Sequence, residues 1–362
     1  MRVKLEDVCE RGSSNLKQSD ISGECGEYPI YGASGYIGNV DFYHQDKPYV
    51  AVVKDGAGIG RTTLHPAYSS VIGTMQYLLP KENVLPEYLF YVVKYMHLEK
   101  YFSGATIPHI YFRDYKNEQF NLVSLDKQGE IIDALGKCER IIQARKTELD
   151  KLDDLIKARF VEMFGDPSDN SAENKVELDE ICEKITDGEH GSVARVSDGH
   201  PFLNAKHIMK NGRIDWDTIT FIGDEDHRRI YKRCNPEEGD ILLTTTGTIG
   251  NVAIMPKYEE VSMDRGITLL KIDRQKVTSE FVAELLRQPS VQMEMGANVH
   301  ASAIGHLFMN KVKKLPAIVP SMERQMEFTV FVKQIDKSKV AVQKALDETQ
   351  TLFDSLMQEY FG

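Results

Sequence analysis

The sequence predicts an α+β protein with two mostly-β domains and two long helices that pair as an antiparallel coiled coil, related by a pseudo-two-fold internal repeat. Two observations carry this prediction. Short β-rich runs alternate with glycine-rich turns in two stretches, and each stretch is followed by a long helical pattern. At 362 residues the chain also exceeds the usual size of a single domain, which favours two.

The elements follow one another in the order domain, helix, linker, domain, helix. A polar, glycine- and proline-containing stretch after the first helical pattern is typical of a linker that releases a second domain. The predicted segments are a first domain at 1–124, a central helix at 125–165, a linker at 166–175, a second domain at 176–320 and a C-terminal helix at 321–362.

The internal repeat is clearest at the helix ends, where Phe164-Gly165 and Phe361-Gly362 stand 197 residues apart. The same offset relates Gln128 to Gln325 and Ile107-Pro-His-Ile110 to Ile304-Gly-His-Leu307. Toward the start of each unit the offset shrinks. It is 190 between the glycine-rich loops, where Asp55 aligns with Thr245, and 173 near the beginning. Rising offsets indicate surface insertions in the second copy.

Shorter elements complete each domain. The β-rich runs at 49–53, 75–79, 241–245 and 267–271 are predicted strands. Helices are expected at Pro86–Lys100 and Ser279–Met293, each led by a residue that suits a first helical turn.

The long helices carry apolar residues at alternating spacings of three and four, which is the pattern of a heptad seam. Such a pattern favours packing of the two helices on each other, whereas the alternative is that each packs only on its own domain. The predicted seam comprises Leu135, Ile142, Leu149, Leu152, Ile156, Ile335, Val342, Leu346, Phe353 and Leu356.

Composition limits the function classes. The net charge is −11 and none of the predicted segments is basic, which argues against a general nucleic-acid coat protein. A specific DNA reader would then need a partner to bind tightly. The five cysteines form no CxxC pair, no apolar stretch approaches the roughly 20 residues that span a bilayer, and the N-terminus lacks a signal core. These features indicate a cytoplasmic protein without a zinc site.

Catalytic signatures are missing. The sequence contains no GxxxxGK[ST] phosphate loop, no GxGxxG that opens a helix after a strand, no GxSxG elbow and no HExxH. Asp166 and Glu173-Asn-Lys175 loosely imitate the acidic cluster of a nuclease, but they lie in the polar linker. We therefore predict neither catalytic residues nor a metal site in this chain.

Two glycine-rich loops between strands are the best candidates for binding. Glycines let the backbone approach a phosphate, and Thr, Asn and Arg can donate to phosphates or base edges. The alternative is that each loop is a tight hairpin whose polar side chains have no role in binding. The matched histidines and nearby basic residues extend the set. The predicted DNA-binding residues are Lys54, Arg61, Thr62, His109, Arg113, Lys116, Lys206, Thr245, Thr246, Asn251, Arg265, His306, Lys311 and Lys313.

The ordered set of these features resembles the specificity subunits of type I restriction–modification systems. The resemblance rests on the domain–helix–domain–helix order, the loops Gly56–Arg61 and Gly247–Gly250, the two histidine segments, the helix starts Leu125–Glu130 and Met322–Glu327, and the helix end Phe164-Gly-Asp166. Met322 departs from the family's usual leucine. The resemblance covers essentially the whole chain.

The resemblance implies that each domain is a target-recognition domain that reads one half of a bipartite, asymmetric site on double-stranded DNA. The helices would set the spacer between the half-sites and dock two modification (methyltransferase) subunits, and restriction (motor-nuclease) subunits would join later. It also implies that this chain is not an enzyme and binds no cofactor, since S-adenosylmethionine, ATP and Mg are expected on the partner subunits.

Two other classes of function stay open at the level of sequence. The chain could be an interaction scaffold that pairs two partners through its helices and does not bind DNA. It could also be an enzyme with an unrecognised site, for example a nuclease that uses the linker carboxylates Asp166 and Glu173.

Overall fold

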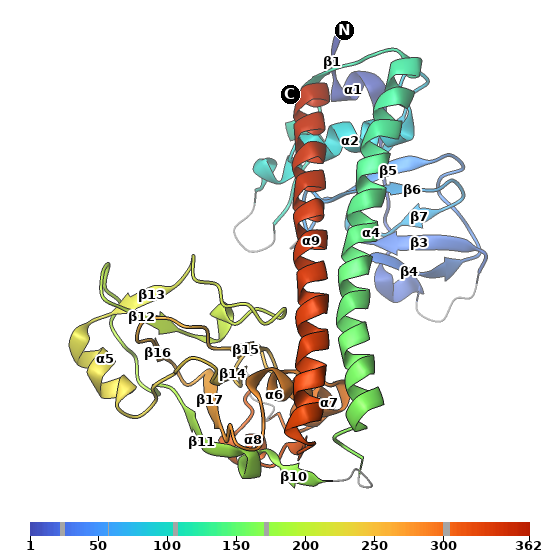
Figure 1. Ribbon diagram of the computed structural model, residues 1–362. Helices are drawn as coiled ribbons and strands as arrows, with labels where there is room; N and C mark the ends of the chain where they lie inside the picture. The colour runs from blue at the N-terminus through green and yellow to red at the C-terminus, as the bar shows by residue number, and fades with distance from the viewer. Residues whose placement is uncertain (22–25, 57, 104–107, 170–173, 300–304) are drawn as a thin grey trace. The chain divides into compact units, whose positions relative to one another are not determined.

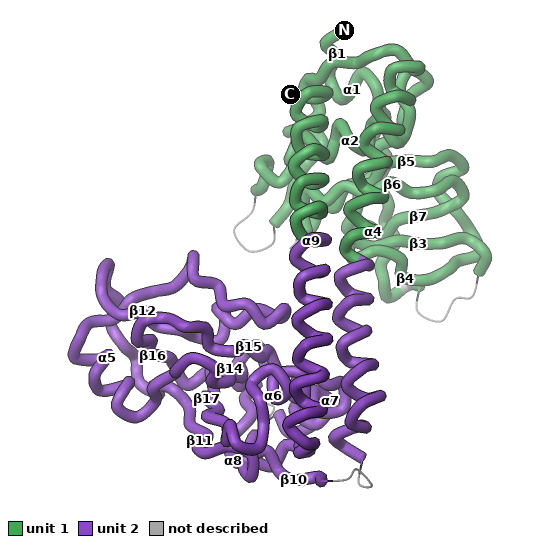
Figure 2. Tube along the Cα trace, viewed as in Figure 1, with its two compact units in different colours: residues 1–146, 343–362 green, residues 147–342 purple. Residues whose placement is uncertain are grey.

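A computed structural model describes residues 1–21, 26–56, 58–103, 108–169, 174–299 and 305–362 (Figure 1). The chain forms two compact units, one of residues 1–146 with 343–362 and the other of residues 147–342 (Figure 2). Each unit therefore contains one sheet-rich domain and one half of each long helix. Within the described ranges, no helix combines the length and the apolar character that a membrane crossing requires.

The first sheet-rich domain contains a four-stranded antiparallel sheet in the order β2-β8-β5-β6, a three-stranded sheet in the order β4-β3-β7, and the pair β1-β9. Its strands are β1 (Arg2–Lys4), β2 (Cys9–Ser13), β3 (Tyr28–Gly32), β4 (Gly35–Val40), β5 (Tyr49–Val53), β6 (Thr62–His65), β7 (Ser70–Val71), β8 (Met75–Pro80) and β9 (Gln119–Asn121). Its helices are α1 (Leu5–Val8), η1 (Gln18–Ile21), α2 (Pro86–Tyr95), η2 (Leu98–Tyr101) and α3 (Phe112–Tyr115).

The second domain repeats these sheets in the orders β11-β17-β14-β15, β13-β12-β16 and β10-β18. Its strands are β10 (Lys175–Glu177), β11 (Cys182–Asp187), β12 (His200–Leu203), β13 (Thr220–Ile222), β14 (Ile241–Thr244), β15 (Val252–Ile254), β16 (Ser262–Met263), β17 (Ile267–Ile272) and β18 (Pro316–Ile318). Its helices are η3 (Leu178–Ile181), η4 (Ala205–His207), α5 (Asp224–Tyr231), α6 (Ser279–Leu286), α7 (Pro289–Ala297) and α8 (Met309–Val312).

The two domains share one topology, which confirms the predicted internal repeat. In each three-stranded sheet the central strand pairs antiparallel with one neighbour and parallel with the other. The insertions of the second copy fall at two places in that sheet. The tight β3–β4 turn becomes the connection 204–219 with η4, and the stretch between β4 and β5 becomes a longer one that holds α5.

The inserted helix α5 is anchored by a buried histidine. His227 stacks on His200 with ring centroids 3.7 Å apart, and its two ring nitrogens lie 2.9 Å from Ser262 Oγ and 3.0 Å from Glu260 Oε2. The inserted segment thus has its own polar anchor in the second domain.

The long helices α4 (Leu125–Phe164) and α9 (Met322–Phe361) each carry a buried glutamine as their fourth residue. Gln128 is fully buried, accepts a hydrogen bond from the Leu85 backbone at 2.8 Å and donates to the carbonyl oxygens of Asn83 and Val123, both at 3.0 Å. The side chain therefore joins the start of α4 to the start of α2.

Gln325 makes the equivalent three bonds in the second unit. It accepts from the backbone of Thr278 and donates to the carbonyl oxygens of Lys276 and Pro320, each at 2.9 Å. One amide thus satisfies three backbone groups at each helix start, which explains why both helices begin on the domain that precedes them.

The two long helices pack together, and none of the predicted seam residues is exposed. In the second unit, Arg159 lies 3.2 Å from Glu327 and over the Phe331 ring, while Lys339 pairs with Asp153 at 2.5 Å. These cross-helix ion pairs give the seam polar positions that fix an antiparallel register.

Each helix ends on the domain that it does not follow. Phe164, at the end of α4, packs edge-on against Phe281 of α6, with ring centroids 5.1 Å apart. Phe361, at the end of α9, packs in the same way against Tyr88 of α2, at 5.4 Å. The matched Phe-Gly ends therefore close equivalent hydrophobic cores, and Gly165 terminates α4 with a φ of +79°.

The predicted boundaries of two short helices are wrong. The helix expected at Ser279–Met293 is two helices, because Pro289 cannot continue α6 and instead begins α7. The helix expected at Pro86–Lys100 ends at Tyr95, because His97 has a left-handed backbone with a φ of +49°. Residues 170–173 of the predicted linker lie outside the described residues.

Candidate nucleic-acid interface

The two glycine-rich loops connect β5 to β6 and β14 to β15, as the sequence predicts. Gly56 and Gly60 have φ values of +90° and +80°, and Gly247 and Gly250 have values of +75° and +90°. These left-handed conformations favour glycine. At Gly60 a side chain would also meet the backbone of Glu99 in η2. The glycines therefore shape both loops.

In the first domain, the histidine segment is bound along the glycine loop. The Gly56 amide donates to Pro108 O at 3.0 Å, and the Ile110 amide donates to Lys54 O at 3.0 Å. Between these bonds, His109 Nδ1 is hydrogen-bonded to the Asp55 carboxylate. We call this arrangement of loop and histidine the clasp.

The second domain has the same clasp. The Gly247 amide donates to Gly305 O at 3.1 Å, the Leu307 amide donates to Thr245 O at 2.9 Å, and His306 Nδ1 lies 2.7 Å from Thr246 Oγ1. Thr246 thus corresponds to Asp55. The sequence alignment of Asp55 with Thr245 is wrong by one residue, because the first loop is one residue longer between its strands.

The chemistry of the two clasps differs. Burial lowers the pKa of His306, and the positive charge of Arg265 lowers it further. Its imidazole is therefore neutral near pH 7 and can accept a hydrogen bond from the Thr246 hydroxyl. In the first domain the partner of the histidine is a carboxylate, so His109 Nδ1 must be the donor.

An exposed aromatic ring follows each clasp histidine at the same spacing. Tyr111 lies against His109 with ring centroids 4.0 Å apart, and Phe308 lies edge-on to His306 at 4.7 Å. Tyr111 is 43% exposed and Phe308 is 47% exposed. The Arg113 guanidinium lies 4.5 Å from the centre of the Tyr111 ring. Each clasp thus has an exposed aromatic side chain beside its histidine.

Two predicted DNA-binding lysines have partners within the fold. Lys116 lies 2.7 Å from Glu6, and Lys313 lies 3.0 Å from Asp179. The hydrogen bond from Lys116 lowers the pKa of Glu6. These equivalent ion pairs join the beginning of each domain to the end of its short helix, α3 or α8.

The predicted loop polar residues mostly bond back to the protein. Thr245 is buried and faces Thr268 at 3.2 Å, and Asn251 Nδ2 donates to Ile208 O at 2.7 Å. Thr62 donates to Gly60 O at 3.2 Å, and Arg61 donates to Ala33 O at 3.0 Å. Their hydrogen bonds stabilise the loops from within.

The remaining predicted residues lie at the surface. Lys206, Arg265 and Lys311 are exposed, and Lys54 is half-buried at the end of β5. Lys54 and Arg113 adjoin the first clasp, and Arg265 and Lys311 adjoin the second, whereas Lys206 lies on η4 in the inserted connection.

The predicted DNA-binding set does not include Tyr111, Phe308 and Asn310, which lie beside the clasps. The offset of 197 that pairs the histidines also pairs Tyr111 with Phe308 and Arg113 with Asn310. The repeat offset could therefore have identified these three residues from the sequence. Ile107 and Ile304, which begin the two histidine segments, lie outside the described residues.

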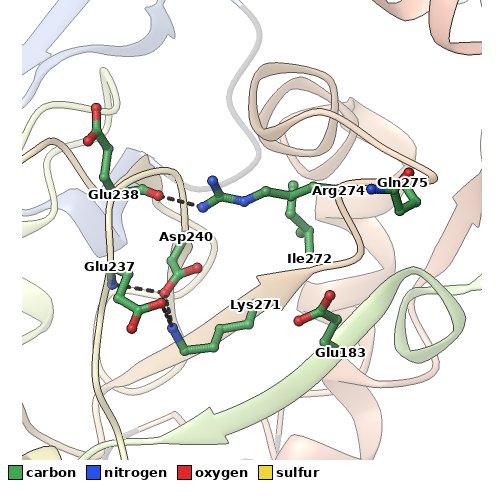
Figure 3. A pocket seen from close by; sticks show the side chains of 8 residues that line it. All are labelled: Glu183, Glu237, Glu238, Asp240, Lys271, Ile272, Arg274 and Gln275. Carbon is green, nitrogen blue, oxygen red and sulfur yellow. Dashed lines mark hydrogen bonds and ion pairs between the residues drawn. The ribbon is translucent and has the colours of Figure 1, made fainter.

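A polar pocket of about 350 Å³ opens in the second unit, lined by Glu183, Glu237, Glu238, Asp240, Lys271, Ile272, Arg274 and Gln275 (Figure 3). Lys271 Nζ lies 2.8 Å from Asp240 and 2.9 Å from Glu237. Burial works against the charge on Lys271, but these bonds outweigh it and raise its pKa. None of the predicted DNA-binding residues lines this pocket, and acidic side chains outnumber basic ones in its lining.

The structure therefore belongs to a class of proteins in which two equivalent sheet-rich domains are carried on one antiparallel helix pair. Residues 1–153 and 172–349 match the type I restriction modification DNA specificity domain. The chain belongs to this family and is a specificity subunit of a type I restriction–modification system, the non-catalytic member that recognises DNA sequence.

Two curated relatives carry the same description. The chain is 22% identical over 308 residues to the type I restriction enzyme MjaIX specificity subunit of Methanocaldococcus jannaschii, covering 77% of this chain and 69% of that protein. It is 24% identical over 170 residues to the EcoBI specificity subunit of Escherichia coli, covering 46% of this chain and 35% of the relative.

Solved structures share the fold. The S subunit of a type I restriction–modification system from M. genitalium superposes with a TM-score of 0.55 at 16% identity, covering 100% of this chain and 96% of that one. A chain from a study of complex assembly and conformational transition of the type I R-M system gives a TM-score of 0.57 at 14% identity, covering 99% and 96%.

Proposed function

We propose that each sheet-rich domain reads one half of a bipartite, asymmetric site in the major groove of double-stranded DNA. The observation that carries this proposal is the pair of equivalent clasps on two domains whose connections around the three-stranded sheet differ. The four-stranded sheets and clasps keep one geometry, whereas α5 and the connection 204–219 exist only in the second domain. A common scaffold with different inserted segments suits two domains that recognise different half-sites.

The helix pair would set the unread spacer between the half-sites and dock two modification subunits. Separation of reading elements fixes half-site spacing in DNA-binding proteins generally. The modification subunits would bind S-adenosylmethionine and methylate adenine, and restriction subunits that use ATP and Mg would join the same assembly. The chain itself would bind none of these cofactors.

Co-expression with a modification subunit that assembles with this chain tests the proposal. Methylated adenines in the host genome are mapped by single-molecule sequencing. The expected result is one bipartite motif with a fixed spacer that is absent without this chain. A host genome without such a motif, in cells where the purified complex is intact, would contradict the proposal.

A further inference from the structure

Arg113 and Asn310 occupy the same place in the two domains. Each stands four residues after the clasp histidine and two after the exposed aromatic ring, as the second residue of α3 or α8. Both side chains are exposed, and the Arg113 side chain is 75% accessible. The histidine and the aromatic position are alike in the two copies, whereas this third position changes from arginine to asparagine.

Both positions are held on a rigid support. The N-cap of α3 is Tyr111, which rests on the clasped histidine, and its C-cap is Lys116, which pairs with Glu6. The Glu6 amide also donates to Lys116 O at 3.1 Å, so the helix has contacts at both ends. Such support suits side chains that must meet a ligand in one geometry.

The second domain fixes α8 in the same way. Its N-cap is Phe308, which lies against His306, and its C-cap is Lys313, which pairs with Asp179.

The interactions around Arg113 leave its guanidinium available. Its described partners are the ring of Tyr111, whose centre is 4.5 Å from Arg113 Cζ, and the adjacent Asp114, whose Oδ1 is 3.5 Å from Arg113 Nε. An exposed ion pair of this kind contributes little stability and yields readily to a stronger partner. For Asn310, no described residue forms a hydrogen bond with the side-chain amide.

Arginine and asparagine differ in the base that they recognise. The arginine fork donates two hydrogen bonds to O6 and N7 of guanine, and the asparagine amide exchanges two with N6 and N7 of adenine. A position that is structurally the same in both readers but chemically different is where half-site preference can reside. The aromatic ring beside it is present in both domains, so it does not by itself distinguish the two half-sites.

We propose that Arg113 and Asn310 are equivalent specificity-determining residues, Arg113 contacting a guanine in one half-site and Asn310 an adenine in the other. The inference rests on the proposed function, since it assumes that each domain reads one half-site. It adds the residues and the bases that they select.

The test exchanges the two side chains in the co-expressed complex and maps methylated adenines. Arg113→Asn should lower the preference for one guanine in one half-site by about 5- to 150-fold, the range expected for a bidentate contact. Asn310→Arg should change the preference for one adenine in the other half-site. Arg2→Asn, which changes an exposed arginine on β1, is the control and should leave the motif unaltered.

Arg113→Lys separates base reading from charge, since lysine keeps the positive charge but lacks the planar fork. It should relax the same position as Arg113→Asn. Unchanged bases in both exchange variants would overturn the inference, and so would an equal loss of methylation at all sites with the complex intact. Absence of a bipartite motif with the wild-type chain would instead contradict the proposed function.

Discussion

At the scale of single residues, the buried glutamines Gln128 and Gln325 make matched hydrogen bonds in the two repeats. Each amide uses its acceptor and its NH2 group to hydrogen-bond three backbone groups. A buried backbone group left without a hydrogen bond costs about 1–3 kcal/mol. The glutamine therefore stabilises the first turn of each long helix and its attachment to the preceding domain.

We expect Gln128→Leu to lower the free energy of unfolding of the first unit by about 3 kcal/mol, because leucine fills the space but satisfies none of the three backbone groups. Denaturant unfolding followed by hydrogen exchange of α2 and the start of α4 measures the loss. Gln334→Leu, at an exposed position of α9, is the control. Equal stability of the two variants would show that the buried amide is dispensable.

The sequence could not show which predicted binding residues form hydrogen bonds or ion pairs within the fold. The residue types at Thr245 and Asn251 suit DNA contacts, but their side chains bond to Thr268 and Ile208 in the fold. Likewise, the partners of Lys116 and Lys313 lie more than a hundred residues away in the sequence. Only the folded chain brings such partners together, so the residue type alone cannot separate a loop-stabilising group from a ligand-binding one.

At the scale of elements, the outer faces of the long helices carry matched apolar residues. Leu155 on α4 and Leu352 on α9 are 47% and 52% exposed and stand 197 residues apart. Ala144 and Ala341 repeat the match, and both are exposed. An apolar side chain kept at the same exposed place in both repeats is expected where two copies of one partner dock.

We therefore predict that Leu155→Glu and Leu352→Glu each remove one modification subunit from the complex, because a charge would have to be desolvated at the interface. Native mass spectrometry should give one bound modification subunit for each single variant and none for the double variant. Val340→Glu is the control, since Val340 is 71% exposed but its counterpart is Gln143. Two subunits retained by the double variant would contradict this docking surface.

Prediction of elements succeeded where the pattern was long and failed where one residue decided the outcome. The heptad spacing over about 40 residues identified both helices and their mutual packing, because a seam needs many repeated apolar positions. The break between α6 and α7 depends on Pro289 alone, and the end of α2 depends on the backbone of His97. A local residue can interrupt a helix without changing the surrounding periodicity.

At the scale of the whole molecule, the repeat explains why the chain divides through the middle of its helices. Each helix begins on its own domain through a buried glutamine and ends on the other through a phenylalanine. The sequence predicted two domains that are each followed by a long helix, and it contained the matched Phe-Gly ends. It could not show which core those ends close, because that depends on the antiparallel pairing of distant segments.

The same construction predicts how the spacer can be changed. Seven residues added to both helices, between Lys146 and Thr147 and between Val342 and Gln343, preserve the heptad seam and lengthen the pair by about 10 Å. If the helix pair acts as a ruler, the methylated motif should keep both half-sites and gain about 3 base pairs of spacer, at about 3.4 Å per pair. Sequencing of methylated adenines in the host genome measures the spacing directly.

Lengthening only one helix provides the control. An extra heptad in α4 alone would displace Asp153 and Arg159 from Lys339 and Glu327, with which they form ion pairs in the second unit. It would also move Phe164 away from Phe281, so this variant should lose stability and methylation together. The doubly lengthened chain should keep both. A doubly lengthened chain that methylates the original motif with its original spacer would exclude the ruler, because the distance between the half-sites would then not depend on helix length.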